Sequence, residues 1–159
     1  MEKRWRDRTG HGSVAGVMVP DDVAQDLLAR SAGWVWLRLF DRSAGLETFD
    51  AVAEAAGLRR LGAGWHEIDR RTATRVLHDL LHRDLAYSAE LIPSRDAARL
   101  ATRFVSAVAD DSSRFATNSS DRLDATSYSW HPATTHTFDG GVVVTGTHGS
   151  AVYWVADED

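Results

Sequence analysis

The clearest chemical signal in the sequence is a pair of histidines, His78 and His82, in the stretch His-Asp-Leu-Leu-His. On a helix, residues four apart project from the same side, and this spacing suits two ligands of one zinc ion. The stretch resembles the His-Glu-x-x-His pattern of metalloproteases, but Asp79 replaces the glutamate, and its shorter side chain reaches a metal-bound water less well. One hypothesis is therefore a metal-dependent hydrolase in which His78 and His82 bind zinc and Asp79 or Glu67 acts as the base. The spacing leaves the third ligand open, and the residues that the fold could bring near are His66, Asp69, His131 and His136.

A purely structural role for these histidines competes with this hypothesis. Helical geometry places His78 and His82 at the edge of the predicted buried face, where a histidine is most often solvated or hydrogen-bonded without a metal. His131 and His136 flank a Pro-containing turn and could lie side by side at the rim of a sheet, where structural roles are usual. The glycine-rich residues 10–16 match neither the G-x-S-x-G pattern nor a P-loop with its lysine. Zinc is therefore expected only under the alternative hypothesis, and no cofactor under the leading one.

Aromatic and acidic residues near the C-terminus favour a different function, binding to a protein partner. In an extended strand over residues 151–155, Tyr153 and Trp154 point to opposite faces, so we expect one of them to face away from the helices. Large rings are effective interface anchors, and nearby carboxylates steer a basic partner toward them. The predicted partner-binding residues are Trp130, Tyr153, Trp154, Asp157, Glu158 and Asp159.

The front of the chain is expected to be rich in helices. Apolar residues at helical spacing and capping residues predict helices over about 23–30, 47–56 and 68–88, and another from Pro93 to about Val108. The last two should pack as a helical hairpin because their connection is short. Residues 34–40, which are aromatic and apolar on both alternating faces, predict a strand covered on both sides.

The back of the chain has the period of strands. Residues 110–121 are rich in Ser, Asp and Asn and predict a loop. Strands are then expected over 123–130, 134–138, 142–145 and 151–155, with a tight turn at Asp139-Gly140-Gly141 and another at His148-Gly149. The expected fold class is α+β, in which a helix-rich N-terminal two-thirds packs on a C-terminal antiparallel β-meander.

Length and composition limit the remaining possibilities. The 159 residues suffice for one domain, which we expect over 20–159, after a flexible, basic and glycine-rich segment at 1–19. The chain has no cysteine and a net charge of −5, so we expect a cytoplasmic protein that does not bind nucleic acid. DNA contact through the basic N-terminus and the helical hairpin is a weaker third hypothesis. No apolar run approaches the roughly 20 residues of a membrane span.

The closing stretch resembles the end of small bacterial α+β proteins. It comprises Trp130-His-Pro-Ala-Thr-Thr-His-Thr-Phe-Asp139, then Gly141-Val-Val-Val144, then Tyr153-Trp154-Val-Ala-Asp-Glu-Asp159. In general character the chain is similar to immunity proteins that neutralise secreted toxins, in its size, acidity and freedom from cysteine. This resemblance implies a non-catalytic protein that binds a basic partner such as a toxin, and it transfers no site residue.

Overall fold

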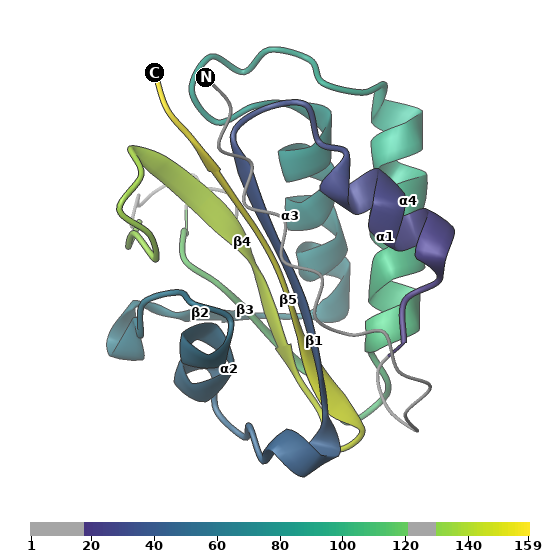
Figure 1. Ribbon diagram of the computed structural model, residues 1–159, viewed down its shortest axis with the longest axis vertical. Coiled ribbons are helices and arrows are strands. Elements are labelled where there is room, and N and C mark those ends of the chain that lie inside the picture. Colours follow the sequence, from purple (N-terminus) through teal and green to yellow (C-terminus); the bar gives the residue numbers. More distant parts are fainter. Residues whose placement is uncertain (1–17, 121–129) are drawn as a thin grey trace.

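The computed structural model describes residues 18–120 and 130–159, which build an antiparallel sheet with helices on both faces (Figure 1). The sheet has five strands in the order β1-β5-β4-β3-β2. The strands are β1 (Trp34–Asp41), β2 (His66–Ile68), β3 (Arg114–Thr117), β4 (Phe138–Thr145) and β5 (Gly149–Asp157). The α-helices are α1 (Asp21–Leu28), α2 (Phe49–Ala55), α3 (Arg70–His82) and α4 (Ser94–Val108). The predicted α+β class is confirmed.

Two helices begin at side-chain caps, whereas α1, expected over 23–30, spans Asp21–Leu28 and follows Pro20 without a side-chain cap. Asp69 accepts a hydrogen bond from the Thr72 amide and starts α3, and Thr48 does the same for the Ala51 amide and starts α2. Helix α4 follows Pro93, and it packs antiparallel against α3 as the predicted hairpin. The predicted helix over 68–88 ends at His82, because the chain turns there and leads into a loop before α4.

Two hydrophobic clusters hold the layers together. The larger lies between the sheet and α1, α3 and α4, and its strand residues include Leu37, Val142 and Tyr153. The smaller lies on the other face under α2 and includes Val143 and Trp154. Strand β5 lies between β1 and β4, and the two clusters cover both of its faces, so every residue from Gly149 to Asp157 is buried. No described helix is both long and apolar enough to cross a membrane.

Two predictions about the back of the chain are wrong. Residues 110–121, expected as a loop, contain β3, whose Phe115 and Ala116 are buried between neighbouring strands. The expected tight turn at Asp139-Gly140-Gly141 is instead part of β4, paired along its length with β5. The physical reason is packing: Gly141 lies so close to β5 that an added Cβ would sit 2.3 Å from the Tyr153 carbonyl oxygen.

Other predictions have mixed outcomes. The strand over 34–40 is confirmed as β1, while residues 134–137, expected in a strand, precede the start of β4 at Phe138. The segment before β4 is organised by Asp139, whose carboxylate accepts hydrogen bonds from the Ala133 and Thr134 amides at 3.0 and 2.7 Å. The strand expected over 123–129 and most of the N-terminal segment expected over 1–19 lie outside the described residues.

Candidate functional site at the edge strand

Tyr153 and Trp154, two predicted binding residues, are fully buried. The Tyr153 hydroxyl donates to the Leu27 carbonyl oxygen at 3.0 Å, and burial raises the pKa of this phenol. The Trp154 ring meets the Trp65 ring edge to face, with centroids 5.9 Å apart. The expectation that one of the pair faces outward is corrected here, because helices cover one face of β5 and α2 with its loops covers the other.

Asp157 is also inside the protein, with 3% of its surface exposed. Its two carboxylate oxygens each accept a hydrogen bond from the Arg30 guanidinium at 2.8 Å, and one of them also accepts from the Leu85 amide at 2.7 Å. Burial raises the pKa of Asp157, but the hydrogen bonds and charge of Arg30 outweigh it and hold the pKa below its usual value. Asp157 therefore joins parts of the fold and cannot steer a partner.

The other three predicted residues are at least partly exposed. Trp130 is half-buried, and its indole nitrogen donates to the Asp139 carbonyl oxygen at 3.0 Å. Glu158 and Asp159 are exposed just beyond the end of β5. Hydrogen bonds from the Thr137 hydroxyl and from His136 lower the pKa of Glu158. Of the acidic tail, only Glu158 and Asp159 are accessible to another molecule.

The fold exposes a different row of aromatic residues, on β1. Three aromatic residues, Trp34, Trp36 and Phe40, lie along the face of β1 that looks toward the α2 side of the sheet, and Arg38 lies on the same face between Trp36 and Phe40. Helix α2 has seven residues and packs on β4 and β5 rather than on β1 (Figure 1). All three side chains are half-buried. The expectation that β1 is covered on both sides thus holds best for the other face, where Val35 and Leu37 are buried under the larger helices and Leu39 is half-buried against the same cluster.

His136 and Glu158 extend this row at one end. The imidazole of His136 stacks on the Trp34 ring with centroids 4.0 Å apart, and its Nδ1 lies 2.8 Å from a Glu158 oxygen. We call Trp34, Trp36, Phe40, His136 and Glu158 the edge-strand surface. It combines flat rings with a carboxylate held in place by its neighbours, which is a composition that suits a protein interface.

The position of β1 adds backbone groups to this surface. Among the described strands, β1 pairs with β5 alone and forms one edge of the sheet. An edge strand presents N–H and C=O groups that can pair with an extended segment of another chain. The sequence shows the aromatic alternation of residues 34–40, but it does not show that the strand is at an edge or that α2 lies elsewhere.

The two histidines of α3 are held by hydrogen bonds to neighbouring residues. His78 lies 2.8 Å from the Ser94 hydroxyl through Nε2 and 3.0 Å from Asp79 through Nδ1, and His82 Nδ1 lies 2.8 Å from the Ile92 carbonyl oxygen. The two rings stack with centroids 5.5 Å apart. No group of three or more His, Cys, Asp or Glu side chains suited to a metal occurs among residues 18–120 and 130–159. These residues therefore fit a role in attaching the loop before α4 better than a zinc site.

The proposed third ligands lie apart from this pair. Asp69 caps the opposite end of α3, and the rings of His66 and His131 face each other with centroids 6.4 Å apart. His131 and His136, expected side by side, are thus associated with different partners. Glu67, the candidate base, forms a bidentate pair with Arg114 at 2.7 and 2.9 Å, and the hydrogen bonds of Arg114 lower its pKa.

Comparison with protein-family models, curated proteins and solved structures finds no match to this chain.

Proposed function

We propose that this protein is a non-catalytic binding protein that neutralises or regulates a protein partner through the edge-strand surface. The observation that carries the proposal is the row of half-buried rings on a strand that has a neighbour on one side only among the described strands. A partner segment that paired with β1 would cover these rings and satisfy the outward backbone groups of the strand in one step.

Burial of the rings would supply most of the affinity. Trp34 and Trp36 retain exposed area that a partner could remove from water. Truncation of a tryptophan at the centre of an interface often costs about 2 kcal/mol or more of binding free energy. The stack between His136 and Trp34 holds the ring in one orientation before binding. A pre-ordered ring loses less conformational entropy on association.

Charge favours a basic partner. The protein has a net charge of −5, and the exposed carboxylates of Glu158 and Asp159 lie at the end of β5 beside Trp34, which pairs with Ala156. Such a field raises the rate of association with a cationic protein and weakens with salt. The specific form of the proposal is an immunity protein that covers the basic cleft of a toxin, and in this form the protein needs no catalytic group.

The test is a quantitative co-purification from the native host. Tagged wild type is compared with the double variant Trp34→Thr/Trp36→Thr, and bound proteins are identified by mass spectrometry. The matched control is Tyr87→Thr, which removes an aromatic ring that is 71% exposed and lies outside the edge-strand surface. Circular dichroism and thermal unfolding confirm that each variant is folded.

The expected result is a basic protein that is retained by wild type and by Tyr87→Thr and lost from the double variant. With the purified partner, the association rate should fall as salt rises, and Glu158→Gln/Asp159→Asn should reduce that dependence. A partner that binds the folded double variant as tightly as wild type would refute the role of the edge strand. Equal association rates at low and high salt would refute the electrostatic part.

A further inference from the structure

The two edges of the sheet are protected to different degrees. Edge strands are usually kept from pairing with other chains by a short length, a β-bulge, a proline or a charge. Strand β2, at one edge, has only three residues, and its central residue is Glu67. Strand β1, at the other edge, pairs with β5 at every position from Trp34 to Asp41 without a bulge, and it contains no proline and, before Asp41, a single charge at Arg38. Of the two edges, β1 is therefore the one on which another strand can lie.

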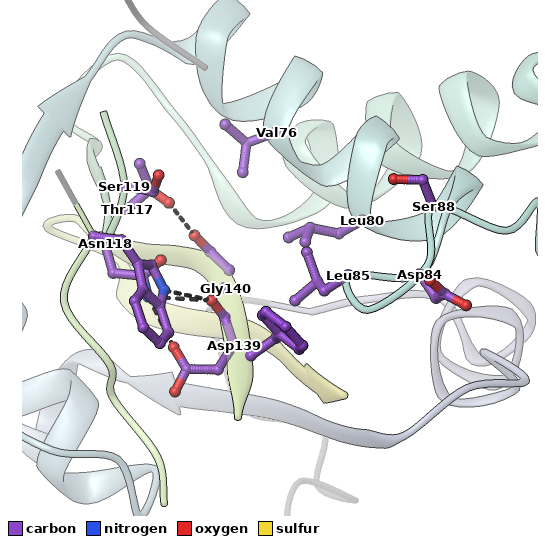
Figure 2. A pocket seen from close by; sticks show the side chains of 13 residues that line it. Val76, Leu80, Asp84, Leu85, Ser88, Thr117, Asn118, Ser119, Asp139 and Gly140 are labelled. Carbon is purple, nitrogen blue, oxygen red and sulfur yellow. Dashed lines mark hydrogen bonds between the residues drawn. The ribbon is translucent and has the colours of Figure 1, made fainter. Parts of the chain in front are cut away.

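The interior strands have their polar groups paired within the chain. Figure 2 shows this at the end of β3, where the Thr117 hydroxyl donates to the Gly141 carbonyl oxygen of β4 at 2.7 Å and the Asn118 amide donates to the Asp139 carboxylate at 2.8 Å. Strand β1 differs, because no described strand lies on its outer side. The outward N–H and C=O groups of this strand are thus available to the backbone of a second molecule.

The sequence of β1 is complementary to itself when two copies run antiparallel about Leu37. In this register Leu37 lies opposite Leu37 of the second copy, and residues equally distant from it on either side face each other. The facing pairs are Val35 with Leu39, Trp34 with Phe40, and Trp36 with Arg38. Directly opposite residues share a face of the sheet, so aliphatic side chains meet on one face and rings on the other, where an arginine over a tryptophan adds a cation–π contact.

Shifts of this register are less favourable. A pairing about Arg38 places Arg38 opposite its own copy and Val35 opposite Asp41, and like charges directly opposite each other destabilise a sheet. A pairing about Trp36 shortens the overlap and leaves Leu39 opposite Gly33, which has no side chain and precedes the strand. The pairing about Leu37 therefore gives the longest overlap without facing charges.

We propose that two copies of this chain form a symmetric dimer by antiparallel pairing of their β1 strands about Leu37. The two-fold axis is perpendicular to the sheet, so α1, α3 and α4 of both copies lie on the same side of one continuous sheet. The outer edges of this sheet are the short β2 strands, so the assembly closes as a dimer and does not grow into a fibre. The dimer goes beyond the proposed function, because it needs no other protein. A partner that pairs with β1 would have to displace the second copy.

Sedimentation equilibrium of the purified full chain, from micromolar to submillimolar concentrations, tests the dimer. We expect a monomer–dimer equilibrium in wild type. Trp36→Lys removes a ring from each copy and places a lysine opposite Arg38 of the second copy, so it should raise the dimer Kd about a hundredfold or more. Tyr87→Thr is the control, since it removes an exposed ring elsewhere and should dimerise as wild type does.

A charge-exchange variant tests whether residues 36 and 38 face each other. Trp36→Lys/Arg38→Glu places opposite charges at these two positions, so its dimer should be about tenfold tighter than that of Trp36→Lys. A lower net charge cannot explain this recovery, because the double variant is more acidic than wild type. Circular dichroism confirms that each variant is folded. A wild type that stays monomeric at every concentration, or a folded double variant without recovery, would overturn the proposal.

Cysteine cross-linking tests the register, because the chain has no cysteine of its own. In Leu37→Cys the two Cα atoms would lie about 4.5–5.5 Å apart across the two-fold axis, within the roughly 4.4–6.8 Å that a disulfide spans. Val35→Cys is the matched control, since both positions are on the same face of β1 and are 8% exposed. Its two copies would be four residues apart along the strand, at least about 13 Å, which is too far for a disulfide.

Under mild oxidation we expect Leu37→Cys to give a covalent dimer and Val35→Cys to stay unlinked. Val35→Cys/Leu39→Cys should be linked again, because these two positions face each other. Equal cross-linking of the two single variants, or a dimer that Leu37→Cys does not link, would refute the register. The co-purification described above separates this proposal from the proposed function. A monomer that captures a partner refutes the dimer alone, and a dimer that captures none refutes the proposed function alone.

Discussion

The Arg30 guanidinium and the Asp157 carboxylate form two parallel hydrogen bonds of 2.8 Å, across 127 positions of sequence. Arg30 follows α1, and Asp157 ends β5. Arg30 also donates to the Leu80 carbonyl oxygen of α3 at 2.8 Å, and the Leu85 amide donates to Asp157. The pair therefore connects three separate parts of the chain at one end of the sheet, and both side chains are almost completely buried.

Replacement of Asp157 should strongly destabilise the fold. In Asp157→Asn the Arg30 charge stays buried without its counter-ion, and breaking a buried pair in this way typically costs about 3–5 kcal/mol. Urea unfolding followed by circular dichroism measures the change in the free energy of unfolding. Asp159→Asn is the control and should stay within about 0.5 kcal/mol of wild type, because Asp159 is exposed. A loss below 1 kcal/mol in Asp157→Asn, on the order of a surface substitution, would contradict the structural role.

The same pair makes stability depend on pH. The pKa of Asp157 is lower in the folded protein than its ordinary value of 3.8, so the unfolded chain binds more protons in the acid range. The stabilisation from this carboxylate is therefore fully present above the unfolded pKa and is lost as pH falls through the folded pKa. We expect the difference in unfolding free energy between wild type and Asp157→Asn to be constant near neutral pH. It should shrink below about pH 4. A difference that stayed constant down to the acid limit would contradict the lowered pKa.

The same substitution to alanine should destabilise the protein at Gly141 and change its stability little at Gly140. A Cβ on Gly141 would overlap the Tyr153 carbonyl oxygen and lie 2.5 Å from a Trp154 ring carbon, so Gly141→Ala must move β5 or a buried ring. We expect it to lose about 1–3 kcal/mol or more, as overpacked cores do. Gly140→Ala meets nothing closer than 3.6 Å and should stay within about 1 kcal/mol of wild type. Urea unfolding of the two variants in parallel measures the change in the free energy of unfolding. Equal losses in the two variants would show that the close approach of β5 to Gly141 is not what disfavours a side chain there.

Zinc should not stabilise the protein through His78 and His82. Their ring nitrogens already lie within hydrogen-bond distance of Ser94, Asp79 and Ile92, and no group of three or more side chains arranged to hold a metal ion occurs among the described residues. We expect the same Tm with excess EDTA and with added zinc, measured by differential scanning fluorimetry. A bound ion would instead add about 2.7 kcal/mol at about 100 times its Kd. Zinc stabilisation that disappears in His78→Ala/His82→Ala would restore the hydrolase hypothesis.

Local sequence patterns determine much of the fold. Helices α3 and α4 follow from apolar residues at helical spacing, from the cap at Asp69 and from the start after Pro93, all of which act within a few residues. Strand β1 follows from its alternating aromatic and aliphatic residues. The α+β class follows from the change of period along the chain. These features depend on short-range interactions, so they are readable without a structure.

Only the tertiary structure decided which surfaces are available. The alternation in β5 shows that Tyr153 and Trp154 point to opposite faces, but their burial depends on α2 and the larger helices covering both faces of an interior strand. Asp157 is recognisable as structural only when Arg30 lies beside it. Strand order and the pairing of distant residues depend on long-range packing, which no local pattern encodes. For that reason the sequence identifies a sheet rich in aromatic rings, but only the fold shows that the rings of β5 are buried and that those of β1 are partly exposed.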